Sequence, residues 1–423
     1  MAENLVTGID IGSTKVATVV AIKSEEEEQP RVIGFNSTPS KGVKRGLVVD
    51  IDQVTATIEE SVEKAERMVG HKINHAFVSV GGPHIASLNS HGVVAILNTR
   101  GEISEEDVER VIEAARAISL STTRQIIDVS AREFIVDGQA GIKNPVGMSG
   151  VRLEVDTHII TASLTNLKNV DRCLADLGIE NDGFIFSGLA SAESVLTDTE
   201  KELGVVLVDI GGGKIDVCVY VDGALSYSSS IPVGARHITN DIAVGLRVSL
   251  ESAERIKLFL SRRLQGKQEV AKNKLEQLNL NELNLPESLS DVSPKTVVDG
   301  IIGSRIEEIY KLIGEEIEKT GFGQSVPSGL VITGGGALTV GMLEIGKKVI
   351  GLPIRLGVPG EITGLVDELI DPQFAATVGL ILRGRKNIME QETGVKRFNK
   401  IFKDFSLGNS LGKIKDIIKQ FIP

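Results

Sequence analysis

Two short segments about 200 residues apart carry the same pattern of residue types. Residues 9–15 are IDIGSTK and residues 208–214 are VDIGGGK, and each segment joins two apolar runs. The pattern predicts two strands connected by a tight glycine-rich turn. A carboxylate at the strand end, followed by turn amides with few side chains in the way, suits a metal-bound polyphosphate. Two such hairpins predict two related half-molecules that grip one nucleotide from opposite sides.

The two turns do not match the better-known phosphate-binding loops. Lys214 is followed by Ile215, where a P-loop needs Ser or Thr, and neither turn has the Gly-x-Gly-x-x-Gly spacing of a dinucleotide fold. Taken alone, an Asp-x-Gly turn also occurs in hairpins that bind nothing. The matched pair favours a shared function, because a near-repeat at this separation indicates duplicated units.

A third glycine-rich element lies at residues 331–337, VITGGGA. Three glycines after an apolar strand leave room for a flat base or a ribose to lie against the backbone. A simple strand-to-helix turn is the alternative interpretation of this segment.

Two scaffolds of similar design are needed to position these turns. We expect strands over 5–10, 15–22, 31–36 and 76–80 and a helix over 52–69. Because the order of strands, helix and strand recurs after residue 200, the sequence predicts two α/β domains of common design.

The pattern changes between residues 83 and 162. Strands are expected near 91–97, 125–136 and 151–161, and a helix over 105–118, for which Ser104 and Asp107 form a capping pair. These elements predict a small α+β insertion in the first domain. Further along, the polar residues 265–295 predict an exposed loop or helical flap, and residues from 383 to about 398 have the composition of a linker.

Composition excludes several classes of protein. The chain has 423 residues and a net charge of -11, which argues against general nucleic-acid binding because a phosphate-binding surface needs clustered Lys and Arg. Cys173 and Cys218 lie in or beside apolar runs and are expected to be buried thiols in a reducing cytosol. With no signal peptide and no run of ~20 apolar residues, the body is expected to be cytoplasmic and soluble.

The last 13 residues form an amphipathic pattern. The apolar residues recur at helical spacing, and lysines occupy the other side. The two groups are Leu411, Ile414, Ile417, Ile418, Phe421 and Ile422, and Lys413, Lys415 and Lys419. Such a helix, ~20 Å long, is too short to cross a ~30 Å hydrocarbon core but can lie in the interface, with its lysines toward anionic lipid headgroups. The alternative is a helix packed on the protein itself, and residues 398–405 either extend the anchor or dock on the body.

The three glycine-rich elements, in this order, resemble the superfamily of actin, sugar kinases and heat-shock chaperones. Within it, roughly residues 5–385 resemble the FtsA family of bacterial cell-division proteins. The resemblance is carried by residues 141–152, 187–191, 194–197, 202–205, the flank of Asp209, residues 231–234 and the stretch from 331–335 to 362–365. The insertion is its most specific part, because actins and chaperones lack this subdomain at this place.

The resemblance implies a two-lobed actin-like α/β fold with a small α+β insertion in lobe 1 and a C-terminal amphipathic helix. Lobe 1 (subdomain 1A) is expected over 1–82, 163–198 and 369–385, and the inserted subdomain 1C over 83–162. Lobe 2 (subdomain 2A) is expected over 199–240 and 300–368, subdomain 2B over 241–299, the linker over 386–409 and the membrane-targeting helix over 410–423.

The resemblance also implies roles for individual residues in binding ATP and Mg²⁺. Asp10 and Asp209 would hold the magnesium ion through water. Phosphates would be bound by Gly12, Ser13, Thr14 and Lys15 on one side and by Gly211, Gly212 and Gly213 on the other. Gly334, Gly335, Gly336 and Ala337 would line the adenosine. Glu254 and Lys257 fit the helix that reaches the ribose and base, although a solvated helix face is the alternative for this pair.

The chain departs from related proteins at two positions. Lys214 stands where the family usually has Thr. The second hairpin therefore carries a second cation, whose side chain either belongs to the nucleotide site or turns outward. Ser187 stands where chaperones carry Glu, and a hydroxyl cannot replace a carboxylate that activates water. We therefore expect nucleotide binding with at most slow ATP hydrolysis.

Our first functional hypothesis is a structural and interaction protein. By resemblance it would be an ATP-binding filament former that ties the C-terminal peptide of the tubulin-like FtsZ to the inner membrane at the division site. The peptide would dock on the subdomain near 241–300, and the insertion at 83–162 would contact other subunits and recruit later division proteins. A single tail would bind the membrane weakly, whereas several tails on one filament would bind it tightly through effective concentration.

Two further hypotheses remain open. One is an enzyme of the superfamily, a phosphotransferase or ATPase in which Asp209 is the catalytic base. The other is an adaptor similar to PilM of pilus assembly, which shares the insertion but would lack the terminal anchor. A chaperone is disfavoured, because no peptide-binding β-domain follows the second lobe.

Overall fold

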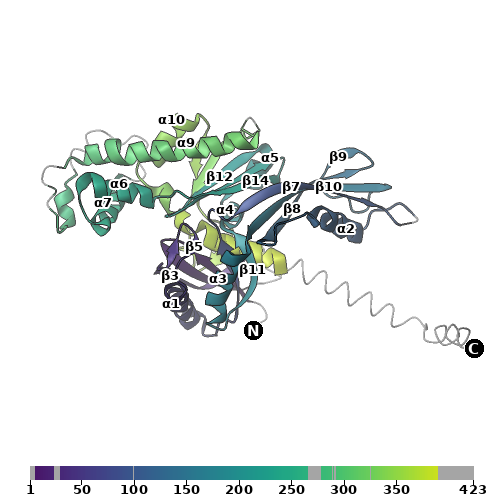
Figure 1. Cartoon of the computed structure of the whole chain (residues 1–423), viewed down its shortest axis with the longest axis horizontal. Helices are drawn as coiled ribbons and strands as arrows, with labels where there is room; N and C mark the ends of the chain where they lie inside the picture. Colours follow the sequence, from purple (N-terminus) through teal and green to yellow (C-terminus); the bar gives the residue numbers. More distant parts are fainter. Residues whose placement is uncertain are drawn as a thin grey trace, which may run out of the picture.

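Two lobes, each built on its own β-sheet, and a third, four-stranded sheet make up most of the described part of the protein, and a short two-stranded sheet pairs β4 (Val43–Lys44) with β5 (Leu47–Val48). The structure is a computed structural model, and it describes residues 5–22, 29–98, 100–264, 278–287, 289, 292–323 and 325–388. Figure 1 shows the inserted sheet at one end of the molecule and helices α6 and α7 at the other. The expected terminal helix over 410–423 and most of the expected linker lie outside the described residues.

The first lobe contains a six-stranded sheet in the order β11-β6-β1-β2-β3-β17. Its strands are β1 (Leu5–Ile11), β2 (Lys15–Ile22), β3 (Arg31–Pro39), β6 (His75–Val80), β11 (Glu180–Phe186) and β17 (Thr363–Gly364). Strands β1, β2 and β3 form an antiparallel meander, and β6 and β11 run parallel to β1.

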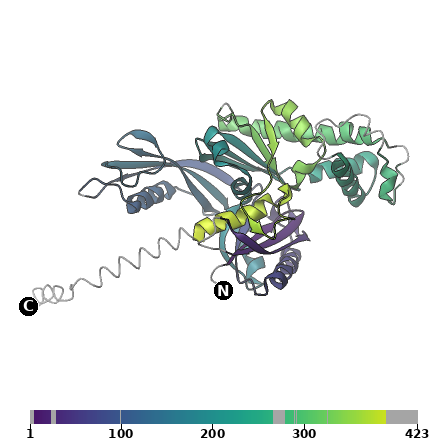
Figure 2. The same cartoon turned by 180° about the vertical axis from the view of Figure 1, so that it is seen from behind.

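Both faces of this sheet are covered. Ile9 and Ile11 pack toward α1 (Ile51–Val69) and α3 (Leu164–Ala175) on one face. Alternate residues such as Val6 face the helix over 375–388 on the other, and this helix is the yellow one in Figure 2. The sequence alternation of the strands therefore produces two separate cores.

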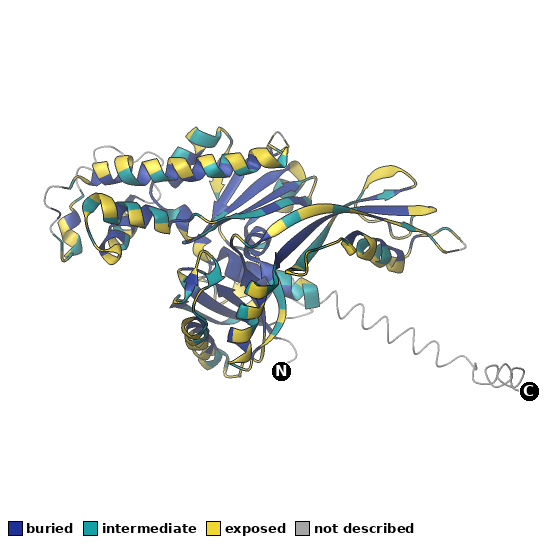
Figure 3. Ribbon diagram, viewed as in Figure 1, coloured by how far each residue is buried: buried dark blue, intermediate teal, exposed yellow. Residues whose placement is uncertain are grey.

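The second lobe repeats the design with a five-stranded sheet in the order β14-β13-β12-β15-β16. The strands are β12 (Val205–Ile210), β13 (Ile215–Val221), β14 (Ala224–Ile231), β15 (Leu330–Thr333) and β16 (Ile354–Leu356). One face packs against helices α6 (Arg236–Leu246), α7 (Leu250–Leu264), α9 (Gly303–Thr320) and α10 (Met342–Ile350), and the other against α4 (Ser187–Val195). Figure 3 shows the strands of both lobes as the most buried part of the molecule.

The inserted subdomain has a four-stranded sheet in the order β7-β10-β8-β9, with α2 (Glu105–Arg116) on one face. The strands are β7 (Ala86–Ala95), β8 (Arg124–Val136), β9 (Gln139–Ile142) and β10 (Arg152–Ser163). The expected capping box of α2 is confirmed, because the Ser104 side chain accepts a bond from the Asp107 amide and the Asp107 side chain accepts one from the Ser104 amide. The sequence therefore predicted the start of this helix.

Although it is inserted in lobe 1, the subdomain also contacts lobe 2. Ser87 Oγ donates to the Ser228 carbonyl of β14 at 2.6 Å, and His158 Nε2 lies 2.8 Å from Ser228 Oγ. Strand β7 begins at Ala86 rather than near 91, because its backbone pairs with β10 from Ala86 onward. Its first residues give no apolar signal, since side chains such as Ser87 are polar and bond to lobe 2.

Other sequence expectations have mixed outcomes. The strands and the helix expected over residues 5–80 are confirmed within one to three residues at their ends. Both cysteines are free and buried, as expected. Of the segment 265–295, expected to be an exposed loop or helical flap, residues 265–277 lie outside the described residues. In the described remainder, Leu280 and Leu289 are buried against the lobe 2 core. Among the described residues, no helix is long and apolar enough to cross a membrane.

Candidate functional site

The two glycine turns lie face to face between the lobes. Each turn is closed by the same backbone bond, from Gly12 N to the Lys15 carbonyl and from Gly211 N to the Lys214 carbonyl, both at 2.9 Å. A Cβ added to Gly213 would lie 2.8 Å from Ser13 Oγ, and one added to Gly212 would overlap the Thr14 methyl group. Glycine is required here because the opposite turn occupies the space of a side chain. The structure thus brings together the two repeats that the sequence separates by about 200 residues.

Asp10 is the next-to-last residue of β1 and is held by side chains of two other segments. Ser79 Oγ of β6 donates to Asp10 Oδ1 at 2.6 Å, and Thr377 Oγ1 donates to Oδ2 at 3.1 Å. Ser79 Oγ also accepts a bond from the Ile11 amide at 3.1 Å, which fixes its orientation. The carboxylate is therefore fixed in position beside the first turn.

Asp209, the next-to-last residue of β12, is at the equivalent position of lobe 2. Ser191 Oγ of α4 donates to its Oδ2 at 2.6 Å. Burial raises the pKa of Asp209 to about 6, and the neighbouring carboxylate of Asp216 and the more distant one of Asp10 act in the same direction, against Lys214 and the Ser191 bond. A cation placed near Asp209 would relieve this unfavourable charge.

Lys15 extends from the first turn toward the segment that precedes the helix over 375–388. Its Nζ donates to the Gln373 carbonyl at 2.5 Å and lies 3.7 Å from the centroid of the Phe374 ring. Burial lowers the pKa of Lys15 to about 8, although Asp10, Asp371 and Asp209 oppose this effect. No carboxylate is bonded to this ammonium in the described part of the chain, so a phosphate would find a cation that lacks an anionic partner.

The third glycine-rich element packs on the end of β12. Gly334 has a φ of 83°, and a Cβ at this position would overlap Asp209 Oδ1. A Cβ on Gly336 would lie 2.7 Å from the Ile210 carbonyl. Gly334, Gly336 and Ala337 are buried, and Gly335 is exposed. The glycines at 334 and 336 therefore allow this loop to approach the metal-binding candidate Asp209.

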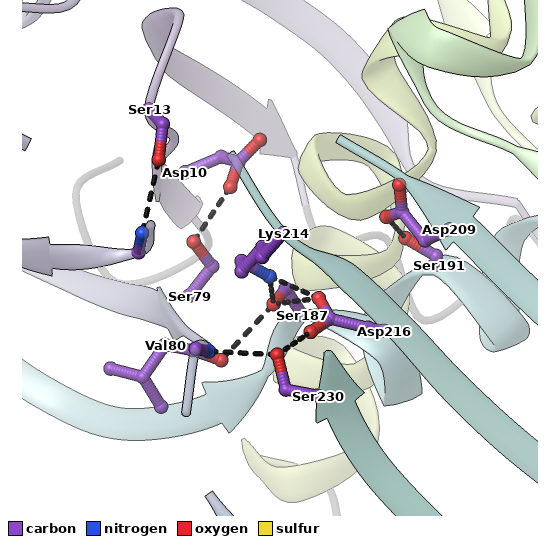
Figure 4. A network of polar contacts seen from close by, with 12 residues as sticks. Asp10, Ser13, Ser79, Val80, Ser187, Ser191, Asp209, Lys214, Asp216 and Ser230 are labelled. Carbon is purple, nitrogen blue, oxygen red and sulfur yellow. Dashed lines mark hydrogen bonds and ion pairs between the residues drawn. The ribbon is translucent and has the colours of Figure 1, made fainter. Parts of the chain in front are cut away.

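Lys214, at the position equivalent to Lys15, has different partners. Its Nζ donates to Ser187 Oγ at 2.6 Å and forms an ion pair with Asp216 (Figure 4). Asp216 Oδ1 accepts a bond from Ser230 Oγ at 2.6 Å, and Ser230 Oγ accepts one from the Gly82 amide at 3.1 Å. Ser187, Gly82 and the strand ends of lobe 1 are thereby connected to two strands of lobe 2.

The pair expected to contact the ribose and base lies between two helices of lobe 2. Lys257 Nζ, on α7, donates to Glu254 Oε2 at 2.8 Å and to Thr239 Oγ1 of α6 at 3.0 Å. Lys257 is buried, whereas the Glu254 side chain is 41% exposed. This polar triad connects α6 and α7, and it leaves the Glu254 carboxylate accessible.

Sequence reasoning missed several residues of the site, which are Ser79, Ser191, Thr377, Asp216 and Ser230. Asp216 had a usable signal, because it is the one charged residue in the otherwise apolar strand 215–221. The serines and the threonine had none, since a hydroxyl in a strand or helix is ordinary until its neighbours are known.

The donor set fits a magnesium ion bound through water. No group of three or more His, Cys, Asp or Glu side chains that could hold a metal occurs among the described residues. Asp10 and Asp209 remain as two carboxylates near the facing turns, and Mg²⁺ in nucleotide sites is held by one or two carboxylates while keeping several waters. The turn amides could then bind the phosphates that share the ion.

Comparison with protein families gives two matches. Residues 206–379 match the family model "Cell division protein FtsA", and residues 82–161 match "SHS2 domain inserted in FTSA". Curated relatives agree. The chain is 37% identical over 387 residues to the cell division protein FtsA of Pseudomonas aeruginosa, covering 90% of this chain and 89% of the relative. It is 33% identical over 400 residues to that of Escherichia coli, covering 93% of each.

Solved structures with the same fold are more distant in sequence. A chain of the PilM-PilN type IV pilus biogenesis complex has a TM-score of 0.61 at 15% identity, covering 90% of this chain and 98% of that one. MreB5 of Spiroplasma citri, solved with AMPPNP, has a TM-score of 0.54 at 13% identity, covering 92% and 99%. These similarities confirm the two-lobed actin-like fold expected from the sequence, and the family match identifies the inserted subdomain.

Proposed function

The chain belongs to the FtsA family of cell-division proteins, and we propose that it is an ATP-binding filament former that ties FtsZ to the inner membrane. The proposal places it on the cytoplasmic face of that membrane at the division site. The observation that carries it is the 37% identity to a cell division protein FtsA over 90% of the chain, together with the facing phosphate turns.

ATP would lie between the two turns. Gly12, Ser13, Thr14 and Lys15 would bind phosphates from lobe 1, and Gly211, Gly212 and Gly213 from lobe 2. Asp10 and Asp209 would hold Mg²⁺, which neutralises phosphate charge when bound. The loop 334–337 and the Glu254–Lys257 pair would contact the nucleoside. MreB5, a protein of the same fold, has been solved with ADP and with AMPPNP, which supports this assignment.

Hydrolysis is proposed to be slow at most. Ser187 has no carboxylate, and its hydroxyl is engaged by Lys214, Asp216 and the Val80 carbonyl. Asp209 is the candidate for a weak catalytic base, because its carboxylate lies just before the second phosphate turn.

The arrangement of subdomains supports filament formation and partner binding. Figure 1 shows the insertion and helices α6 and α7 at opposite ends, so a contact between these ends would be heterologous and could continue indefinitely. A hollow of about 350 Å³, lined by residues such as Leu280, Asn284 and Pro286, lies within the expected subdomain 241–299. We propose this region for the FtsZ peptide and the insertion for subunit contacts and later division proteins.

Membrane binding is proposed for the C-terminal segment from its sequence. Leu411, Ile414, Ile417, Ile418, Phe421 and Ile422 would enter the interface, with Lys413, Lys415 and Lys419 toward anionic lipids. One tail buries only a few apolar side chains and must order a short helix, so its binding alone would be weak. Assembly of the ATP-bound body would strengthen it through effective concentration.

Co-sedimentation with anionic liposomes tests the proposal. The full chain should pellet with liposomes, more strongly with Mg-ATP, and a chain ending at Asn409 should stay in solution. A full-length variant with Ile414 and Ile418 replaced by Gln tests the apolar face separately from the lysines, because it keeps every charge of the tail. It should also stay in solution. If the truncated chain binds as well as the full chain, the tail is not the anchor and the proposal fails.

FtsZ filaments provide the second readout. FtsZ filaments should pellet with liposomes only when the full chain is present. The truncated chain should fail to bring them to the liposomes but should still bind the FtsZ C-terminal peptide in solution. Peptide binding that is absent from both chains would contradict the proposed partner.

A further inference from the structure

The Lys214 side chain is enclosed by groups from both lobes. Its side chain is only 13% exposed, and its Nζ contacts Asp216 of lobe 2 and Ser187 of lobe 1. A Cβ added to Gly81, at the end of β6, would overlap this Nζ. Glycine at 81 thus leaves the space that the ammonium occupies. Figure 4 shows the lysine pointing toward Ser187 and Asp216.

A charge requirement explains the position of this lysine. Asp216 is 1% exposed and is the register partner of Asp209 on the neighbouring strand. Two carboxylates directly opposite each other are unfavourable, and a buried carboxylate needs a cationic or hydrogen-bonding partner. Lys214 supplies the charge that Asp216 needs and thereby leaves Asp209 available for another cation.

The first hairpin lacks this requirement. Asp10 is paired with Ala17, so no second carboxylate lies opposite it. Lys15, the equivalent of Lys214, is correspondingly bonded to a backbone carbonyl rather than to a carboxylate. The comparison within one chain indicates that the Lys214 and Asp216 side chains form a unit.

This unit also connects the lobes. Ser187 Oγ lies 2.7 Å from Asp216 Oδ2 and 3.1 Å from the Val80 carbonyl at the end of β6. On its other side, Asp216 accepts from Ser230, which in turn accepts from the Gly82 amide. Gly82 directly precedes the inserted subdomain. The ion pair is thus bonded to the start of α4 and, through Ser230, to the root of the insertion.

We propose that Lys214 is a positioning residue: its ammonium is the internal counter-ion of Asp216, and this pair ties lobe 2 to lobe 1, holding the two phosphate turns in place before nucleotide binds. The tie itself follows from the contacts alone, and only its consequence for nucleotide rests on the proposed function. A direct phosphate contact by Lys214 is the competing role.

Charge-matched variants of the full chain distinguish the two roles. Lys214→Met leaves Asp216 buried without its cation, and it should lower the unfolding midpoint without nucleotide by several degrees and reduce the midpoint shift caused by Mg-AMPPNP. Adding Asp216→Asn removes the buried charge that has lost its cation. The double variant should therefore recover most of the unfolding midpoint without nucleotide and most of the midpoint shift with Mg-AMPPNP. Lys64→Met, at an exposed lysine of α1 paired with Glu60, is the control and should change neither.

Hydrogen exchange locates the effect. The Gly82 amide should exchange faster in Lys214→Met than in the wild type, and the double variant should restore its protection. If Lys214→Met yields too little soluble protein, recovery of soluble protein in the double variant is the expected result.

Two results would overturn the proposal. A Lys214→Met protein with a wild-type midpoint and wild-type exchange at Gly82 would exclude the tie. A double variant that recovers its midpoint but remains as deficient in Mg-AMPPNP binding as the single variant would assign Lys214 to phosphate. If wild-type protein gives no shift with Mg-AMPPNP, the proposed function fails, while the midpoints without nucleotide still decide whether the tie exists.

Discussion

His158 should make the protein sensitive to acid at the contact between the insertion and lobe 2. This side chain on β10 is 1% exposed, its Nδ1 donates to Asn89 Oδ1 at 2.7 Å, and its Nε2 accepts from Ser228 Oγ at 2.8 Å. Both ring nitrogens are therefore satisfied in the neutral form. Burial lowers the pKa of His158 to about 4, and the nearby charge of Arg132 acts in the same direction.

The sign and size of the effect follow from this shift. Because the pKa in the folded protein is below the unfolded value of about 6.5, the unfolded chain binds more protons between these two values. The stabilisation is complete above about pH 6.5 and is lost progressively as the pH falls toward 4. From about pH 7.5 to about pH 5, the loss attributable to this one group is about 2 kcal/mol.

Urea denaturation at these two pH values measures the loss. Far-UV circular dichroism is the suitable signal because the chain has no tryptophan. The His158→Gln variant, which keeps a donor and an acceptor but does not titrate, should show a pH-dependent loss smaller than that of the wild type by about 2 kcal/mol. A variant of the exposed His71 is the control and should keep the wild-type difference. Equal losses in wild type and His158→Gln would refute the reasoning.

Three further predictions concern the turns and the insertion. Burial lowers the pKa of Lys15 to about 8, and a bound phosphate would raise this pKa again. The ATP affinity measured by isothermal titration calorimetry should therefore fall above pH 8, by up to about tenfold per pH unit. The Lys15→Met variant should bind ATP more weakly, and its affinity should lack this pH dependence. Gly334→Ala places a Cβ onto Asp209 Oδ1 at a φ of 83° and should lower the unfolding midpoint and abolish the shift with Mg-AMPPNP, whereas Gly360→Ala, with open space around its Cβ, should change neither. Ser104→Ala removes a capping bond of α2 and should cost about 1 kcal/mol, measured as faster amide exchange in α2 but not in the strands of lobe 2.

Local patterns in the sequence predicted most of the fold. The two hairpins, the long first helix and the capped helix of the insertion could be located from alternation, helical spacing and caps, because these signals lie within a few residues of one another. The start of β7 could not, since its first residues are polar and become a strand by pairing with β10, which lies about 70 residues further along the chain. The burial of Leu280 and Leu289 could not be predicted either, because it depends on a core made by distant segments.

The sequence also pointed to the two candidate aspartates and the turn glycines, because duplication made them visible, and the structure places the two turns against each other. It did not identify the hydroxyl groups that orient the aspartates. Ser79 and Thr377 bond to Asp10, and they are 69 and 367 residues away from it in the sequence. No local pattern marks such residues, since their role is set by packing of segments that are far apart in the chain.

The two departures that the sequence presents separately are one feature of the structure. The side chains of Lys214 and Ser187, the two positions at which the sequence was expected to depart from related proteins, bond to each other at 2.6 Å. A glutamate at 187 would bring a second carboxylate to Asp216 and compete with it for the lysine, whereas a serine accepts from the ammonium and adds no charge. Lys214 and Ser187 are therefore compatible with each other through Asp216. On the proposal above, Ser187 would help to hold the lobes together, and its hydroxyl offers no carboxylate that could activate water.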